Sequence, residues 1–231
     1  MQLITVGGPP SCGKTSVILK TLQHIREDGV RAGVVKFDCL STQDMEIFEA
    51  AGVPVLTGIS ANFCPDHYFV TNIEDCFAWG QREGLDLLIS ESAGLCNRCA
   101  PHIKGFLSVC VLDNLSGVNT PRKVGPMLKT ADTVIVTKGD IVSQAEREVF
   151  AYRIRQANPK ARIHFVNGIT GQGAWEVSRM WKTAASAETL EGGRMRFPVP
   201  TAVCSYCFGE TRIGEEHHQG TVRKINIPEA S

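Results

Sequence analysis

The residues with the most specific chemistry lie close to the first residue of the chain. Residues 8–15, with the sequence GPPSCGKT, match the spacing G-x-x-x-x-G-K-[ST] and follow the apolar run at residues 3–6. In such a loop, backbone N–H groups bind phosphates, the lysine reaches the β- and γ-phosphates, and the last hydroxyl ligates Mg²⁺. A helix expected at residues 16–27 completes the strand, loop and helix that the motif requires. The predicted nucleotide-binding residues here are Gly8, Pro9, Pro10, Ser11, Cys12, Gly13, Lys14, Thr15 and Ser16.

Two acidic residues stand directly after apolar runs. Glu91 follows residues 86–90, and Asp38 follows residues 32–37. A carboxylate at the end of a buried strand commonly holds Mg²⁺ directly or through water. The plainer interpretation of Glu91 is a surface acid, and Asp38 is equally consistent with an acid at a helix N-terminus. We expect Lys14, Thr15, Asp38 and Glu91 to carry the phosphoryl chemistry, with Thr15, Asp38 and Glu91 placed at the magnesium ion.

A third motif indicates which base the nucleotide carries. Residues 137–140, with the sequence TKGD, approximate the base-reading motif N-K-x-D and follow an apolar run. The carboxylate of Asp140 can accept two hydrogen bonds from guanine, whereas adenine lacks that pair of donors. The aliphatic stem of Lys138 can cover the base. We therefore expect GTP and GDP as ligands, although Thr137 replaces the usual asparagine and a plain loop aspartate is the alternative.

Nine cysteines are many for a chain of 231 residues, and several have the spacing of metal ligands. Cys96, Cys99 and His102 form C-x₂-C-x₂-H in a loop after a strand, and two thiolates at this spacing can bind one ion. Cys64 and His67 could complete a four-ligand site, within one subunit or across a dimer. Thiolate and imidazole ligands suit Zn²⁺, Ni²⁺ or Cu, and the alternative is cysteines scattered through the core and surface.

The end of the chain has a second group of metal-binding residue types. Cys204 and Cys207 form C-x₂-C, and His217 and His218 follow ten residues later. This pattern is consistent with a small zinc-stapled appendage, a metal store that feeds the loop site, or an iron–sulfur link. It is also consistent with a tail that binds no metal, because the spacing matches no complete ligand pattern.

The elements that position these residues follow an alternating order. Nearly continuous apolar runs predict buried strands at 3–6, 32–37, 53–57, 85–90, 107–112, 133–137 and 162–166. Helices are expected at 16–27, 42–51, 73–82, 125–129, 143–157 and 173–185. This alternation predicts an α/β fold with a mostly parallel sheet flanked by helices on both faces. Glycines and prolines after residue 190 break the pattern, so we expect a P-loop domain at 1–190 and a short Cys/His-containing tail at 191–231.

Charge and hydropathy exclude some classes of partner. The chain has 24 acidic residues and 24 lysines and arginines, so bulk electrostatics favour neither nucleic acid nor a membrane surface. No apolar run is long enough to span a bilayer, and the first residues lack the pattern of a signal peptide. The expectation is a cytoplasmic protein that binds neither nucleic acid nor membrane.

The order and spacing of these motifs resemble a known family over residues 1–182. Besides residues 8–15, residues 91–94 (ESAG) resemble its E-x-x-G signature, and residues 113–117 (DNLSG) resemble the segment before the base-reading motif. Residues 170–173 (TGQG) are similar to its T-G-E-G at the start of the last helix, with Asn167 in the preceding base-contact loop. The chain thus resembles the nickel-insertion GTPases HypB and UreG, which mature hydrogenase and urease, within the P-loop GTPase group that includes CobW-type proteins.

This resemblance implies a SIMIBI-like P-loop NTPase fold and a GTPase that dimerises with GTP and carries a transition metal near the dimer contact. In the urease branch a Cys-Pro-His motif holds the metal, and here Cys64 to His67 have the same components with one residue inserted. The hydrogenase branch has a cysteine after the E-x-x-G signature, where this chain has Cys96 and Cys99.

The expected function is a GTP-hydrolysing metallochaperone that delivers nickel to an apo-metalloenzyme, with other maturation proteins as partners. The expected cofactors are GTP or GDP, Mg²⁺, and a transition metal, Ni²⁺ or Zn²⁺. Two alternatives stay open. One is a metal-sensing binding module with little turnover, and the other is a small-molecule P-loop kinase.

Overall fold

The computed structural model describes residues 1–40, 44–94, 97–198, 209–220 and 223–228. Seven strands form one sheet in the order β3-β2-β4-β1-β5-β6-β7, and every neighbouring pair is parallel. The expected α/β architecture with a parallel sheet is confirmed, and all seven predicted strands are present. The strands are β1 Gln2–Gly7, β2 Ala32–Asp38, β3 Val55–Ile59, β4 Leu87–Ser92, β5 Leu107–Asp113, β6 Thr133–Thr137 and β7 Arg162–Phe165.

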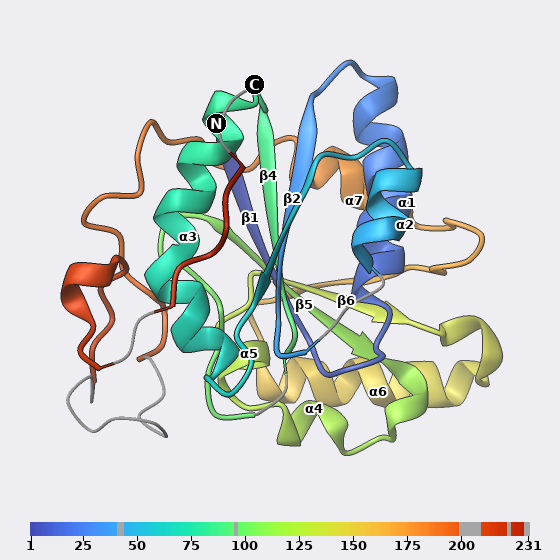
Figure 1. Ribbon diagram of the computed structural model, residues 1–231. Helices are drawn as coiled ribbons and strands as arrows, with labels where there is room; N and C mark the ends of the chain where they lie inside the picture. The colour runs from blue at the N-terminus through green and yellow to red at the C-terminus, as the bar shows by residue number, and fades with distance from the viewer. Residues whose placement is uncertain (41–43, 95–96, 199–208, 221–222, 229–231) are drawn as a thin grey trace.

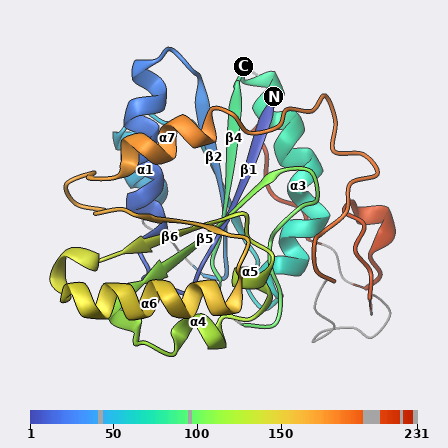
Figure 2. The same ribbon diagram turned by 180° about the vertical axis from the view of Figure 1, so that it is seen from behind.

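Helices cover both faces of the sheet (Figures 1 and 2). The α-helices are α1 Lys14–Glu27, α2 Asp44–Ala50, α3 Pro65–Arg82, α4 Thr120–Lys123, α5 Pro126–Lys129, α6 Gln144–Ala157 and α7 Ala174–Trp181. Short 3₁₀ turns are η1 Asn114–Ser116, η2 Gly139–Ile141 and η4 Glu215–His217. None of the helices in the described part of the chain is long and apolar enough to cross a membrane.

Alternate residues of each strand point to opposite faces, and this divides the core into layers. On one face, Ile4, Val34 and Ile89 pack against α1 and α7. On the other face, Leu3, Val35 and Leu88 pack beneath α3, while the β5 and β6 half of that face is covered by α4 to α6. Because the central strands are buried on both faces, they have the nearly continuous apolar runs seen in the sequence.

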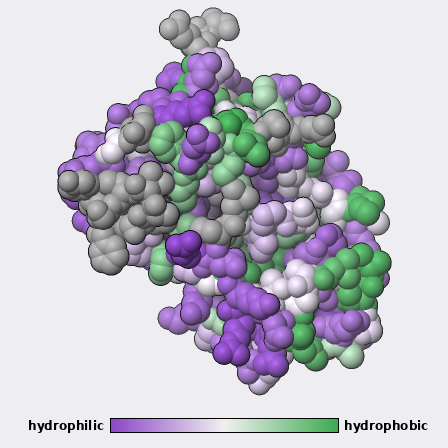
Figure 3. Space-filling model, turned by 60° about the horizontal axis from the view of Figure 1, so that its bottom comes forward, coloured by the Kyte–Doolittle hydropathy of each residue, from purple (hydrophilic) through white to green (hydrophobic). Residues whose placement is uncertain are grey.

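The parallel strands all end at the same edge of the sheet, at the bottom of Figure 1. Figure 3 brings this edge forward and shows hydrophilic surface with separate hydrophobic patches. In an open parallel sheet, ligands bind in the crevice beyond the carboxyl ends of the strands. The loops that follow β1, β2, β4, β5 and β6 therefore determine what this protein binds.

Candidate functional site

The phosphate loop runs from the end of β1 to the start of α1. Gly13 adopts a left-handed conformation with φ 88° and precedes the first residue of the helix, Lys14. The Lys14 ammonium is buried and donates hydrogen bonds to the carbonyl oxygens of Gly8 and Pro9, at 3.1 and 3.0 Å. The lysine therefore lies across the loop whose backbone N–H groups, together with the positive end of α1, suit an anion.

Glu91 is the last acidic residue of β4 and lies against the start of α1. Its carboxylate accepts a hydrogen bond from the Thr15 hydroxyl, with Oγ1 at 3.1 Å from Oε1, and it is 1% exposed. The ammonium of Lys36 on β2 lies 2.9 Å from the same carboxylate, and it also pairs with Asp44 at the start of α2. Thr15 donates to Asp44 as well, at 3.2 Å. One threonine hydroxyl and two carboxylates thus gather beside the phosphate loop, a set of oxygen ligands that fits Mg²⁺.

Lys36 stays charged in this buried network. Burial alone lowers the pKa of its ammonium, but the carboxylates of Glu91 and Asp44 outweigh that effect and raise the pKa above its ordinary value. Asp38, at the end of β2, lies 4.0 Å from the Lys36 ammonium and accepts a hydrogen bond from the backbone N–H of Cys39. Asp38 is thus near the same network, although Asp44 rather than Asp38 contacts Thr15.

The turn after β4 presses against the phosphate loop. Gly94 has φ 62°, and a Cβ atom at this position would lie 1.9 Å from the carbonyl oxygen of Gly8. Only glycine permits this approach, because any side chain would collide with the backbone of the loop. The ESAG segment is therefore in direct contact with the phosphate loop, so a movement of one requires a response from the other.

The TKGD segment at residues 137–140 contacts the phosphate loop from the other side. The Thr137 hydroxyl donates to the Cys12 carbonyl at 2.7 Å, and the Lys138 ammonium lies 3.2 Å from the Ser11 carbonyl and pairs with Asp113. Lys138 itself has φ 56°, a left-handed conformation that is uncommon outside glycine. Threonine at position 137 therefore connects the two loops, in the place where the motif usually has asparagine.

Asp140 and Asn167 line the same hollow, of about 400 Å³, between the ends of β6 and β7. Asp140 is exposed and therefore accessible to a ligand in this hollow. The Asn167 side chain accepts hydrogen bonds from the backbone N–H groups of Ile169 and Thr170, so it fixes the turn that precedes α7. The two residues thus occupy neighbouring positions at the expected base end of the site.

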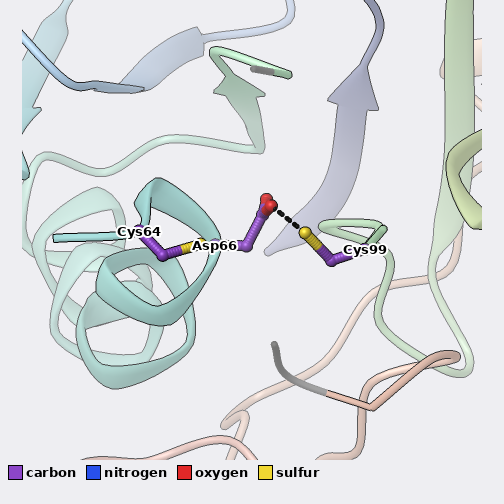
Figure 4. A group of neighbouring side chains, drawn as sticks. All are labelled: Cys64, Asp66 and Cys99. Atoms are coloured by element: carbon purple, nitrogen blue, oxygen red, sulfur yellow. Dashed lines mark hydrogen bonds between the residues drawn. The ribbon is translucent and has the colours of Figure 1, made fainter. Parts of the chain in front are cut away.

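Cys64, Asp66 and Cys99 form a compact group of metal-ligand types on the α3 side of the sheet edge (Figure 4). Their ligand atoms all lie within 4.8 Å of one another. The Cys99 thiol donates to the Asp66 carboxylate at 2.5 Å, and the Ser92 hydroxyl donates to the same carboxylate at 3.3 Å. Asp66 has no ion pair within the described residues, although it is 5% exposed. A divalent cation would complete this set of one buried carboxylate and two thiols.

Two members of the group have pKa values shifted in opposite directions, downwards for Cys64 and upwards for Asp66. The interaction with the neighbouring Cys99 side chain lowers the pKa of the Cys64 thiol to about 7, against the opposing effect of burial. Burial raises the pKa of Asp66 above its ordinary value, although the hydrogen bonds from Cys99 and Ser92 oppose this. A thiol with a lowered pKa is a ready metal ligand, because metals bind the thiolate.

His67, another predicted metal ligand, is not part of this group. Cys64 caps α3, and His67 lies on its first turn, but the His67 ring packs against His218 of the tail with 5.4 Å between ring centres. Burial lowers the pKa of both imidazoles, so the neutral forms are favoured. Cys96, Cys204 and Cys207 lie outside the described residues.

His102 is a core residue in the structure. It is fully buried, its Nδ1 lies 3.0 Å from the Thr5 hydroxyl, and its Nε2 lies 3.1 Å from the Met127 carbonyl. Both ring nitrogens are thus engaged within the fold. Sequence spacing alone had associated His102 with Cys96 and Cys99, but the hydrogen bonds direct its ring into the core.

The burial of His102 predicts a loss of stability in acid. Desolvation lowers its pKa from 6.5 to about 4, so the unfolded chain binds more protons than the folded chain between these values. The contribution of this group to the free energy of unfolding should therefore be constant above pH 6.5. It should fall by up to about 3 kcal/mol as the pH drops towards 4. Urea unfolding of the wild type and of His102→Gln between pH 7 and 4 measures this pH dependence.

The variant should be less stable than the wild type at pH 7, and its free energy of unfolding should fall less on acidification. An equal fall in the two proteins would contradict the lowered pKa of His102.

Some residues of the site gave little signal in the sequence. Lys36 sits inside an apolar strand, where a charged residue is unusual and could have marked a buried ion pair. Asp44 and Asp66 are acids in the first turns of α2 and α3, where an acid commonly interacts with the helix dipole and so carries no specific signal. Only the fold brings them next to Thr15 and Cys99.

The chain is similar to known proteins over most of its length. Residues 2–165 match the family model described as CobW/HypB/UreG, nucleotide-binding domain. The chain is 46% identical over 226 residues to an uncharacterized protein of Methanocaldococcus jannaschii, covering 98% of this chain and 97% of the relative. It is 26% identical over 212 residues to the urease accessory protein UreG of Trichodesmium erythraeum, covering 80% and 96%.

A solved structure shares the fold. The crystal structure of HypB from Helicobacter pylori in complex with nickel superposes with a TM-score of 0.62 and 19% sequence identity, covering 78% of this chain and 85% of that one. Residues 2–165, which match the family model, contain the phosphate loop, the ESAG turn, the TKGD segment and the Cys64–Asp66–Cys99 group. The chain therefore belongs to the CobW/HypB/UreG family of P-loop GTPases.

Proposed function

We propose that this protein is a GTPase that binds a transition-metal ion, nickel foremost, and delivers it to an apo-metalloenzyme under the control of the bound nucleotide. One observation carries the proposal. Glu91 and Ser92 are consecutive residues of β4, yet Glu91 contacts Thr15 in the nucleotide site and Ser92 contacts Asp66 in the cysteine group. A shift of this strand end that accompanies nucleotide binding or hydrolysis would reach both sites.

The nucleotide half of the function rests on the residues around the phosphate loop. Mg²⁺ would neutralise charge on the β- and γ-phosphates when bound, with Thr15, Glu91 and Asp44 as the nearest oxygen ligands and Asp38 beside them. Lys14 would bind the phosphates from within the loop, and Asp140 would select guanine. Phosphoryl transfer needs mainly positioning and charge stabilisation, which is what these groups can supply.

The metal half rests on the donor set of Cys64, Asp66 and Cys99. Two thiols and one carboxylate suit a borderline divalent ion such as Ni²⁺ or Zn²⁺ better than Mg²⁺, which prefers oxygen alone. Three protein ligands leave a position open, as a site that must release its ion requires. The structural neighbour from Helicobacter pylori is described in complex with nickel, which supports nickel as the cargo.

A GTP-dependent homodimer is the expected assembly. Large apolar side chains are exposed in the loops that follow several strands at the nucleotide edge, and exposed apolar surface of this kind marks interaction sites. These residues are Leu40, Leu115, Val118, Ile141 and Ile169. A partner of the dimer, an apo-metalloenzyme or another maturation protein would cover them. Residues 1–190 would form the GTPase domain, and residues 191–231 its Cys/His-containing tail, in a cytoplasmic protein.

The central test is the coupling between nucleotide and metal. We expect the affinity for Ni²⁺ to differ at least about fivefold between the protein bound to GDP and to a non-hydrolysable GTP analogue, within the usual range of allosteric coupling. Isothermal titration with Ni²⁺ in each nucleotide state measures it, and an ATP analogue is the control for base selection.

Equal Ni²⁺ affinities in the two nucleotide states would overturn the coupling. Metal-dependent partner binding without GTP hydrolysis would indicate a metal-sensing module instead. A phosphorylated metabolite formed from the nucleotide would indicate a kinase.

A further inference from the structure

The described part of the tail is fixed against α3. The side-chain amide of Asn72, which is fully buried, donates to the Arg223 carbonyl at 2.9 Å and accepts from the Ile225 N–H at 2.8 Å. Ile213 is fully buried in the same core layer as the apolar face of α3, and the Gly214 N–H donates to the Val70 carbonyl at 3.1 Å. The tail thus forms part of the packed structure on this face of the sheet, beside α3 in Figure 1.

This packing brings two histidines together from distant parts of the chain. His67 lies on the first turn of α3, and His218 directly follows η4, which packs on the same helix. Their rings are 5.4 Å apart between centres and inclined at 69°. His218 is only 6% exposed, so its ring is a buried polar group that needs partners.

Each ring presents one nitrogen that has no hydrogen-bond partner among the described residues. These atoms are Nε2 of His67 and Nδ1 of His218, and both are buried. The other nitrogen of His218, Nε2, lies 2.8 Å from the Arg212 carbonyl. A carbonyl oxygen only accepts, so Nε2 carries the proton and Nδ1 carries a lone pair. A histidine whose second nitrogen donates to a backbone carbonyl is the usual arrangement of a metal ligand.

We propose that Nε2 of His67 and Nδ1 of His218 bind one divalent transition-metal ion, at a site separate from Cys64, Asp66 and Cys99. Two imidazoles that bind one ion at ~2.0–2.1 Å with a tetrahedral angle have ring centres roughly 5 Å apart. The observed 5.4 Å is close to this value. Simple ring packing would leave two buried nitrogens without partners, whereas an ion satisfies both. Water would complete the coordination.

The ligands of this site differ from those of the proposed cargo site. The two proposals can therefore be disproved independently of each other. Neutral imidazoles suit Zn²⁺, Ni²⁺ or Co²⁺. An ion held by His67 and His218 would join the tail to the same turn of α3 that carries Asp66. The tail would then be held against this turn more firmly when the metal is present.

Nitrogen-15 NMR of the histidine rings tests the proposal directly. The probe is Zn²⁺, titrated past two equivalents into the full-length protein. The resonances of His67 Nε2 and His218 Nδ1 should both shift to the position of a coordinated nitrogen. If neither resonance shifts at saturating Zn²⁺, the proposal is wrong.

Variants then separate ligation from packing. In a background with Cys64→Ser and Cys99→Ser, His218→Phe keeps an aromatic ring on α3 but removes the ligand, and Zn²⁺ binding should weaken at least tenfold. His217→Phe is the matched control, because the His217 ring pairs with Glu216 and lies outside the pair. Equal affinities in the two variants would overturn the proposal. The wild-type titration decides the question even if a variant fails to fold.

Discussion

We expect Lys14→Ala to reduce the rate of GTP hydrolysis by at least about 100-fold. Lys14 is the one group of the phosphate loop that brings a full positive charge to the phosphates, and loss of a single preorganised donor to transition-state charge typically costs 10²–10³ in rate. In the structure its ammonium already lies within hydrogen-bond distance of the Gly8 and Pro9 carbonyls, so it is positioned over the loop. Release of phosphate from GTP at saturating Mg²⁺ measures the effect.

Lys20→Ala is the matched control for this variant, because Lys20 lies on the same helix beyond the phosphate loop. It should retain the wild-type rate. Binding of Ni²⁺ by Lys14→Ala should stay measurable, because Lys14 makes no contact with the cysteine group. If hydrolysis and metal binding were both lost, Lys14 would have a role in folding rather than in catalysis. Undiminished hydrolysis by Lys14→Ala would place the active site elsewhere.

The sheet could be predicted from the sequence because its strands are buried on both faces. Each therefore appears as a short apolar run, and glycine or polar residues separate one run from the next. Helix boundaries were less predictable. The periodicity indicated a helix at residues 73–82, whereas α3 begins eight residues earlier, at Pro65. Proline is favoured in the first turn of a helix, where its missing N–H is not needed. The motif around Cys64 thus stands on the first turn of a helix rather than in a loop.

The nucleotide site could be outlined from the sequence, but its ion-pair network could not. Residues 8–15 and 137–140 are local motifs, in which all residues lie close together along the chain. The pairing of Lys36 with Glu91 and Asp44 depends on β2 lying next to β4, and chain order does not reveal that neighbour. The sequence pattern therefore predicted Thr15 and Glu91 as neighbours at one site, and the structure places them in contact. The partners that hold their orientation come from strand order.

The predicted metal ligands show the same division between local pattern and fold more clearly. Sequence spacing grouped Cys99 with Cys96 and His102, because they are close along the chain. In the structure, His102 turns into the core, and Cys99 meets Cys64 and Asp66 at the start of α3. Asp66 is the residue inserted between Pro65 and His67, so the departure from Cys-Pro-His supplies a carboxylate to the group.

This grouping leads to the prediction with the largest effect on metal binding. Cys99→Ala should weaken the binding of Ni²⁺ at least about 100-fold, because it removes a thiolate ligand that lies beside Cys64 and Asp66; a 100-fold change corresponds to about 2.7 kcal/mol. Asp66→Asn, which keeps the shape but loses the charge, should weaken binding in the same direction. Equilibrium dialysis with Ni²⁺ measures both variants.

Cys76→Ala is the matched control, because Cys76 is buried in the middle of α3, separate from the Cys64–Asp66–Cys99 group. It should bind Ni²⁺ as the wild type does. If Cys99→Ala kept its affinity while a Cys204→Ser, Cys207→Ser double variant lost it, the tail would be the main cargo site. The coupling through Glu91 and Ser92 would then lose its route to the metal, since that route runs through the contact of Ser92 with Asp66. The same dialysis therefore tests both where the ion binds and whether β4 can transmit the nucleotide state to it.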